Sequence, residues 1–148
     1  MTLWRLSPHA ALDGAGGLVT EARWHTQGHR VIYCASSPAS ALLEVLVHIE
    51  IEPDDLLRPV QYLEIEAPAA ISLETADMDH IANWRVNESA TRALGDDWLD
   101  TGRSALLRVP SVIVPVTWNV LINPLHPDSA AIRVLRIHKQ AIDPRLAP

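Results

Sequence analysis

Three side chains in the first third of the sequence could carry out chemistry together: a guanidinium, a phenol and a carboxylate. Arg23, Tyr33 and Glu44 follow one another at nearly equal intervals. An arginine can bind phosphate oxygens with two N–H groups, an aromatic ring can stack on a flat ligand, and a carboxylate can stabilise a developing positive charge. Each also has an ordinary interpretation. Arg23 could form a surface ion pair with Glu21 or Glu44, and Tyr33 could be a core residue.

Glu44 is the most unusual of the three because of its surroundings. It lies in the apolar segment 37–51, SPASALLEVLVHIEI, which is predicted to form a helix with Ser37 as its N-cap and Pro38 in its first turn. An ionised carboxylate is rarely left unpaired among apolar residues. Helical spacing places Glu44 on one face with the smaller or more polar residues Ser40, Ala41, Val47 and His48. The helix is therefore expected to bury its leucines and point one carboxylate into a pocket, the alternative being a glutamate on the solvent face.

The other two residues of the trio are predicted to lie on extended segments. Arg23 falls in 18–25 and Tyr33 in 30–36, and the two segments could form a hairpin through a turn at Gly28. Further strands are predicted at 2–6, 59–67 and 131–138, with two or three buried strands in 104–121. The segment 87–98 is predicted to be helical up to Gly95, while 7–17 is a loop and 52–59 a polar connection. Because strands and helices do not alternate strictly, the pattern favours an α+β fold.

Composition limits the class of protein. The chain has 148 residues, of which 48% are hydrophobic, which fits one domain spanning 1–148. Its formal charge of −6 argues against direct nucleic-acid binding, and its single cysteine, Cys34, excludes an intrachain disulfide and suits a reducing compartment. No signal peptide or apolar run of membrane-spanning length is seen, so we expect a soluble, cytoplasmic protein.

Several common sites are missing from the sequence. It contains no G-x-G-x-x-G, no P-loop and no G-x-S-x-G elbow. The seven histidines form no helical metal-binding pair, because Gly28 puts His25 and His29 in a turn. We therefore expect neither a metal nor a bound cofactor.

The chain resembles a known family, the RES-domain toxins of bacterial toxin–antitoxin pairs. The resemblance extends from Leu3 to Leu146. It rests on several segments in the right order: ARW before Gly28, VIYCASSPASALLEVLVH, TRALGDDWL, and SALLRVPSVIVP followed by WNVLINPLHPD. Two positions depart from the family pattern. Ala22 stands where a glycine is usual, and Thr117-Trp118 stands where an acidic residue is common.

The resemblance implies a fold similar to the ADP-ribosyltransferase toxins, a split β-sheet around a cleft that binds NAD⁺, with few helices. It implies that NAD⁺ is a substrate. Carried over to this sequence, the family's site residues are Arg23, Tyr33, Glu44 and Ser111. Substrate-binding roles are expected for Trp24 and Asn119, although either could equally be a packing residue.

The function implied by the resemblance is that of an NAD⁺-consuming toxin, which cleaves the nicotinamide–ribose bond by hydrolysis or phosphorolysis. One alternative is an ADP-ribosyltransferase that modifies a specific protein. Another is a catalytically silent nucleotide-binding partner of a DNA-binding regulator. The implied partner is a helix-turn-helix antitoxin of the Xre type, which would supply the DNA contact.

Overall fold

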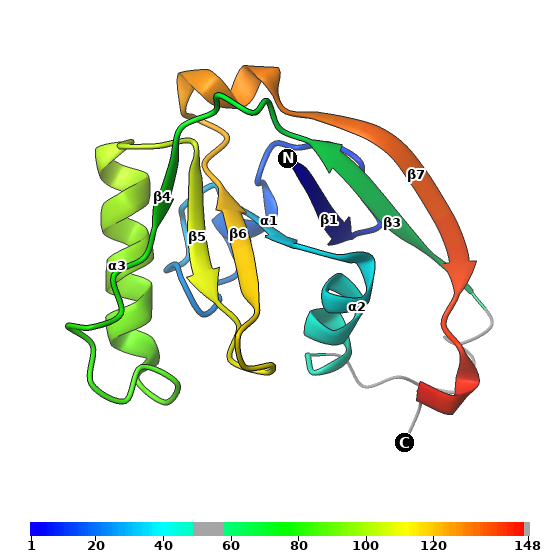
Figure 1. Ribbon diagram of the computed structural model, residues 1–148, viewed down its shortest axis with the longest axis horizontal. Helices are drawn as coiled ribbons and strands as arrows, with labels where there is room; N and C mark the ends of the chain where they lie inside the picture. The colour runs from blue at the N-terminus through cyan, green and yellow to red at the C-terminus, as the bar shows by residue number, and fades with distance from the viewer. Residues whose placement is uncertain (49–57, 147–148) are drawn as a thin grey trace.

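A mixed seven-stranded sheet forms the centre of the molecule (Figure 1). The computed structural model describes residues 1–48 and 58–146. The strand order is β4-β5-β6-β2-β1-β3-β7, and every neighbouring pair is antiparallel except β4 and β5. The strands are β1 (Thr2–Leu6), β2 (Ile32–Ala35), β3 (Pro59–Glu66), β4 (Leu73–Thr75), β5 (Leu106–Pro110), β6 (Trp118–Ile122) and β7 (Arg133–Ala141).

Few helices accompany the sheet. They are α1 (Gly16–Val19), α2 (Pro38–Leu46) and α3 (Glu88–Thr101), together with 3₁₀ turns at Pro127–Ala131 and Pro144–Leu146. The α+β class predicted from the sequence is confirmed. Within the described ranges, no helix has the length and apolar character needed to cross a bilayer.

The sheet consists of two halves joined by a narrow connection. The register between β1 and β2 contains one Cα pair, Trp4 with Ala35, whereas β3 and β7 are paired along almost their whole length. The strands β4, β5, β6 and β2 lie on one side of this junction, and β1, β3 and β7 lie on the other (Figure 1). Helix α2 follows β2 directly and lies below the junction, so its residues can reach both halves (Figure 1).

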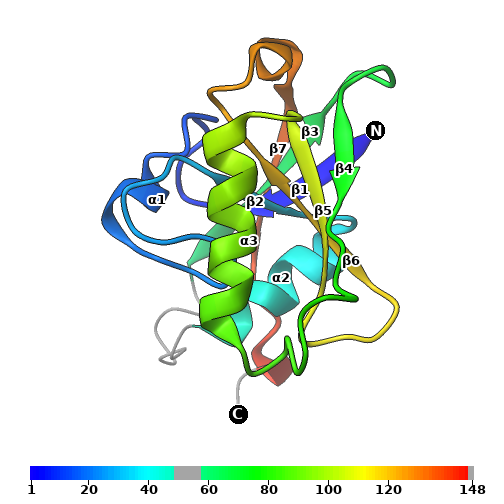
Figure 2. The same cartoon turned by 90° about the vertical axis from the view of Figure 1, so that its left-hand side faces the viewer.

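The two faces of the sheet carry separate hydrophobic clusters, because successive side chains of a strand point to opposite faces. On β2, Ile32 and Cys34 belong to one cluster, while Tyr33 packs against the other. Helix α3 covers the Tyr33 face (Figure 2). The centre of this second cluster is formed by Trp98 of α3 with Leu107, Val109 and Leu121 of β5 and β6. The site described below lies on this same face.

Helix α2 starts as the sequence predicts. The Ser37 side chain accepts a hydrogen bond from the Ser40 N–H at 3.0 Å, and Pro38 occupies the first helical position. The described part of the helix ends at Leu46, and residues 49–51 of the predicted segment lie outside the described residues. The predicted connection 52–59 also lies largely outside them.

Helix α3 is longer than the sequence suggests. The prediction that it ends at Gly95 is wrong, because the helix continues to Thr101 and is terminated by Gly102, which has a left-handed φ of 61°. Gly95 does not end the helix; its lack of a side chain is required by packing. A Cβ atom there would lie 2.7 Å from the backbone carbonyl carbon of Trp24, so the absent side chain makes room for another chain segment.

The segment that carries Arg23 is not a strand. The predicted extended conformation of 18–25 is wrong, since α1 occupies its beginning and a tight turn closed by the Ala22–His25 bridge occupies its end. The hairpin through Gly28 is also wrong, because β2 pairs with β1 and β6 instead. Contacts with α3 hold this turn, and such contacts override the weak periodicity of a short segment. The remaining predicted strands are confirmed, with β5 and β6 as the strands within 104–121.

Candidate active site

The Glu44 carboxylate is held by two neutral donors from a different part of the chain. Ser111 Oγ and Asn119 Nδ2 each donate a hydrogen bond of 2.9 Å to Glu44 Oε1. Helix α2 supplies the acid, while Ser111 directly follows β5 and Asn119 lies near the start of β6. In the described part of the chain, the second oxygen, Oε2, has no hydrogen-bond partner. The carboxylate is thus fixed in orientation with one oxygen left to interact with a ligand.

Ser111 is suited to orient an acid because its other bonding capacity is already used. Its Oγ accepts hydrogen bonds from the backbone N–H groups of Ile113 at 3.1 Å and Val114 at 3.2 Å. Its own N–H donates to the Thr117 carbonyl at 2.8 Å, which closes the loop between β5 and β6. A hydroxyl has one proton to donate, so the proton of Ser111 points to Glu44. Ser111 therefore caps the backbone of this loop and holds the Glu44 carboxylate at the same time.

Asn119 has an unused acceptor. While its Nδ2 donates to Glu44, its Oδ1 is buried without a hydrogen-bond partner among the described residues. A buried polar atom without a partner costs free energy. A ligand N–H placed beside Glu44 would satisfy it.

Tyr33 uses its hydroxyl within the protein. The Tyr33 oxygen accepts a hydrogen bond from the Trp24 N–H at 3.2 Å and lies 2.7 Å from His25 Nδ1. Burial raises the pKa of the Tyr33 phenol well above its usual value, so the group stays neutral and cannot serve as a base at physiological pH. Through these bonds Tyr33 fixes the turn that carries Arg23.

Arg23 faces the N-terminal end of α3. Its guanidinium donates to the Arg85 carbonyl and to Glu88 Oε1, each at 3.1 Å, and its side chain is 24% exposed. Among the described residues Arg23 forms its ion pair with Glu88, and not with Glu21 or Glu44 as the sequence suggested. The turn is also held from α3 by Thr91, whose hydroxyl donates to the Arg23 carbonyl at 2.6 Å. Arg92 donates to the carbonyl of Ala22 at 2.9 Å.

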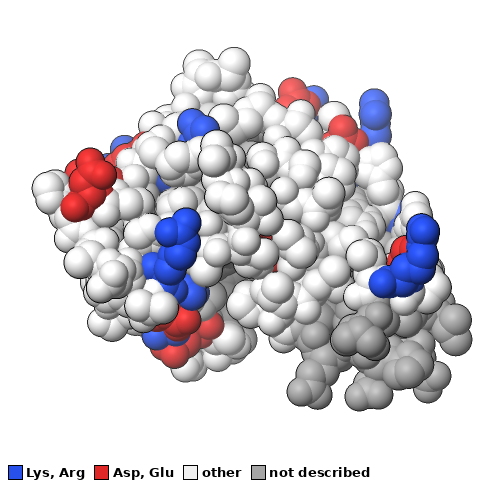
Figure 3. All heavy atoms as spheres, turned by 60° about the horizontal axis from the view of Figure 1, so that its bottom comes forward, with Lys and Arg blue, Asp and Glu red and all other residues white. Residues whose placement is uncertain are grey.

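The register of the sheet makes the two groups of residues neighbours. Tyr33 lies opposite Leu121, and Ala35 lies opposite Asn119. Tyr33 and Asn119 therefore occupy diagonal positions on one face of β2 and β6, a spacing of about 7–8 Å. No hydrogen bond within the described residues joins Tyr33 or Arg23 directly to Glu44. Helix α2 and the loop between β5 and β6 both lie at the lower end of the molecule (Figure 1), and Figure 3 turns this end toward the viewer.

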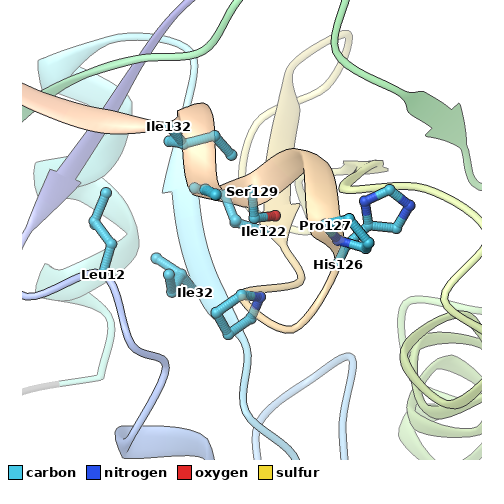
Figure 4. A pocket seen from close by; sticks show the side chains of 9 residues that line it. Leu12, Ile32, Ile122, His126, Pro127, Ser129 and Ile132 are labelled. Atoms are coloured by element: carbon cyan, nitrogen blue, oxygen red, sulfur yellow. The ribbon is translucent and has the colours of Figure 1, made fainter.

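A pocket also lies away from these residues. It has a volume of about 350 Å³ and lies on the opposite face of the sheet, where Leu12, Ile32, Ile122 and Ile132 line it (Figure 4). His126 is the only ionisable residue among those that line it. An apolar wall of this kind lacks the cations and fixed carboxylate that a dinucleotide needs, so the chemistry is better served by the Glu44 face.

A comparison with known protein families gives a match over almost the whole chain. The family model described as the RES domain matches residues 2–144. The chain belongs to the RES-domain family. It is 43% identical over 135 residues to a protein named Toxin Res from Pseudomonas putida, covering 90% of this chain and 92% of the relative. It is 36% identical over 154 residues to a Prs ADP-ribosylating toxin from Sphingobium sp., covering 98% and 96% of the two chains.

A solved structure shows the same fold. The RES domain described here aligns with a chain of the Mycobacterium tuberculosis MbcT–MbcA toxin–antitoxin complex with a TM-score of 0.70, covering 95% of this chain and 84% of the other. The sequence identity is 16%, so this likeness concerns the fold alone. It confirms the mixed sheet with few helices as the architecture.

Trp24, which was also expected to bind substrate, is buried inside the RES domain. Trp24 is 3% exposed and packs in the cluster around Trp98, with its ring centroid 6.3 Å from that of Trp84. A contact between its indole and a ligand stays a prediction, whereas its backbone N–H has a defined partner in Tyr33. Sequence reasoning missed His25, which is 2% exposed and bonded to Tyr33. A polar residue in a turn gave no signal that it would be buried.

Proposed function

We propose that this chain is the toxin of a type II toxin–antitoxin module and that it consumes NAD⁺ by cleaving the bond between nicotinamide and ribose. The observation that carries the proposal is the Glu44 carboxylate, with Oε1 held by Ser111 and Asn119 and Oε2 left for a ligand. The names of the relatives, Toxin Res and Prs ADP-ribosylating toxin, support the same direction.

Cleavage of this bond requires the protein mainly to orient NAD⁺ and to stabilise the charge that develops on the ribose. In the proposed reaction the bond between ribose C1′ and the nicotinamide nitrogen breaks, and its electron pair goes to that nitrogen, which loses its positive charge. The sugar passes through an oxocarbenium-like centre, as in glycoside hydrolysis. An acceptor oxygen then forms the new bond to C1′ and loses its proton. Because nicotinamide leaves as a neutral molecule, no strong general acid is needed.

Each residue has a role that its surroundings allow. Glu44 Oε2 would bind the ribose hydroxyls and stabilise the positive charge that develops at C1′. Asn119 Oδ1, the buried acceptor, would take the N–H of the nicotinamide carboxamide. Arg23 has five N–H groups, of which the structure uses two, so the others can bind a phosphate oxygen. The flat face of Tyr33 would pack against the nicotinamide ring or the ribose.

The acceptor decides between hydrolysis, phosphorolysis and protein modification. The Sphingobium relative named for ADP-ribosylation gives the transfer reaction a specific observation in its favour. Purified protein would be incubated with NAD⁺ in water, in phosphate buffer and with bacterial extract. Mass spectrometry should find free nicotinamide in each case. It should find ADP-ribose with it after hydrolysis, ADP-ribose 1″-phosphate after phosphorolysis, and an ADP-ribosylated protein after transfer. Intact NAD⁺ in all three incubations would contradict an enzymatic role and favour a catalytically silent nucleotide-binding partner of a DNA-binding regulator.

The partner follows from the same proposal. We expect a helix-turn-helix antitoxin of the Xre type to bind this chain in the cytoplasm and block NAD⁺ consumption. The structural neighbour is itself a toxin–antitoxin complex, which supports a protein partner without defining its type. Co-expression with an antitoxin of this type should restore growth and yield a complex that co-purifies. Continued growth arrest on co-expression would contradict it.

A further inference from the structure

The hydroxyl of Tyr33 is one member of a hydrogen-bonded chain that passes through a buried histidine. His25 Nε2 lies 2.9 Å from the Thr20 carbonyl, and His25 Nδ1 lies 2.7 Å from the Tyr33 oxygen. The Tyr33 oxygen in turn accepts the Trp24 N–H at 3.2 Å. The His25 side chain is almost completely removed from solvent, at 2% exposure. A buried imidazole with partners on both nitrogens has a fixed ring orientation.

The partners also fix the positions of the protons. A backbone carbonyl can only accept, so the Thr20 carbonyl requires a hydrogen on Nε2. A neutral imidazole carries one N–H, which leaves Nδ1 of His25 as an acceptor. The Tyr33 hydroxyl must then donate its proton to Nδ1, because an Nδ1 without a hydrogen can only accept. The chain of bonds therefore has one direction, from Tyr33 through His25 to Thr20.

His25 closes the turn that carries Arg23 in a second way. Its backbone carbonyl accepts the Ala22 N–H at 3.2 Å, which makes Arg23 and Trp24 the two central residues of the turn. The His25 side chain thus ties the end of this turn to β2 through Tyr33. Because His25 holds both the Tyr33 phenol and the turn that carries Arg23, it sets the distance between these two groups of the proposed site.

We propose that His25 is a positioning residue of this site: its neutral imidazole accepts the Tyr33 proton at Nδ1 and so holds the phenol ring and the Arg23 turn in one arrangement. The catalytic consequence rests on the proposed function, whereas the hydrogen bond itself does not. Protonation of Nδ1 would remove the acceptor, release the Tyr33 hydroxyl and loosen the arrangement. Activity is therefore expected to fall as the pH drops.

The groups around His25 favour the neutral form. Burial lowers the pKa of His25 below its ordinary value of 6.5, and the nearby imidazole of His29 lowers it further. The carbonyl of Thr20, the carboxylate of Asp96 and the backbone of Gly17 act in the opposite direction, but burial outweighs them. The imidazole is thus uncharged at neutral pH, as the acceptor role requires.

Two substitutions separate the two nitrogens of the ring. In His25→Asn, the amide oxygen can take the place of Nδ1 and accept from Tyr33 without titrating. In His25→Gln, the amide nitrogen can take the place of Nε2 and donate to Thr20, while the acceptor for Tyr33 is lost. We expect His25→Gln to lower kcat for NAD⁺ consumption about tenfold, the effect of one hydrogen bond. His25→Asn should recover most of that loss and abolish the acidic limb of the pH profile.

The experiment combines this series with a readout that does not need activity. Nitrogen-15 NMR of the histidine ring should show Nε2 protonated and Nδ1 bare at neutral pH, with a shift at Nδ1 in Tyr33→Phe. His25→Gln combined with Tyr33→Phe should be no slower than the slower single variant, because both remove the same bond. Equal losses in His25→Gln and His25→Asn, additive losses with Tyr33→Phe, or a protonated Nδ1 would overturn the proposal. If the wild type leaves NAD⁺ intact, the proposed function fails, and the NMR result still decides the role of His25.

Discussion

Gly95→Ala tests whether α3 and the Arg23 turn are as tightly packed as the structure shows. Gly95 lies in the interior of α3, where alanine is normally favoured over glycine by about 1 kcal/mol. Helix propensity alone therefore predicts that the substitution stabilises the protein. The structure predicts the opposite sign, because the new Cβ would lie 2.7 Å from the carbonyl carbon of Trp24 and closer still to its oxygen.

The expected magnitude follows from what would have to move. The atoms in conflict belong to backbone, so no side chain can rotate away, and either the turn or the helix must shift. Overpacking of this kind costs about 1–3 kcal/mol. The turn is also held by hydrogen bonds that Thr91 and Arg92 donate and by one that Tyr33 accepts, and breaking one of them adds about 1 kcal/mol. After subtraction of the gain in helix propensity, we expect the free energy of unfolding to fall by about 1–3 kcal/mol.

Urea unfolding of the variant and the wild type measures this difference. Gly16→Ala is the matched control, because a Cβ on Gly16 meets nothing within 4 Å. Its effect should stay within about 0.5 kcal/mol. The same displacement would move Arg23, so Gly95→Ala should also reduce NAD⁺ consumption while Gly16→Ala does not. A Gly95→Ala protein as stable as the wild type would refute the close contact between α3 and the turn.

Four further predictions concern buried groups and the arginine. Burial raises the pKa of the Cys34 thiol to about 12, so a disulfide reagent should label it only after unfolding, and rapid labelling of the folded protein would contradict this. Ser104→Ala leaves the Trp98 indole N–H, bonded to Ser104 at 2.9 Å, without its acceptor, and should cost about 1–3 kcal/mol in urea unfolding; an unchanged midpoint would disagree. The folded protein holds the pKa of His25 below 6.5, so below pH 6.5 the unfolded chain binds more protons than the folded one. The free energy of unfolding should therefore decrease as the pH falls below 6.5, whereas His25 has no effect on it at higher pH. In His25→Asn the free energy of unfolding should decrease less over the same pH range. Arg23→Lys cannot keep the forked contact and should lower kcat/KM about tenfold with a stability change below about 1 kcal/mol, measured by steady-state kinetics and urea unfolding; full activity would argue against a binding role.

The sequence predicted those parts of the site that depend on local signals. The cap at Ser37 is confirmed. The polar stripe of α2 predicted a carboxylate that points into a pocket, and in the structure Ser111 and Asn119 hold that carboxylate. The family resemblance selected Ser111, since a serine after a proline has no distinctive pattern of its own. Periodicity works here because a helix with one apolar side has few ways to bury it.

The remaining parts could not be predicted, because long-range packing fixes them. The Arg23 turn was expected to be a strand, but its conformation depends on hydrogen bonds from α3, about seventy residues later. Gly95 was expected to end a helix, since a glycine that ends a helix and one that admits another backbone are identical in sequence. His25 was missed for the same reason, as its burial depends on Tyr33 and Thr20.

The most direct test of the central claim is the rate of nicotinamide release from NAD⁺ by the wild type and by Glu44→Gln. The matched control is Glu74→Gln, which likewise replaces a carboxylate by an amide, here on β4, where Glu74 forms an ion pair with Arg103. We predict that the wild type and Glu74→Gln release nicotinamide at similar rates, and that Glu44→Gln is slower by about 100-fold or more, as expected for the loss of a group that stabilises the transition state. Equal rates in all three proteins would contradict the assignment of Glu44 as the residue that acts on NAD⁺.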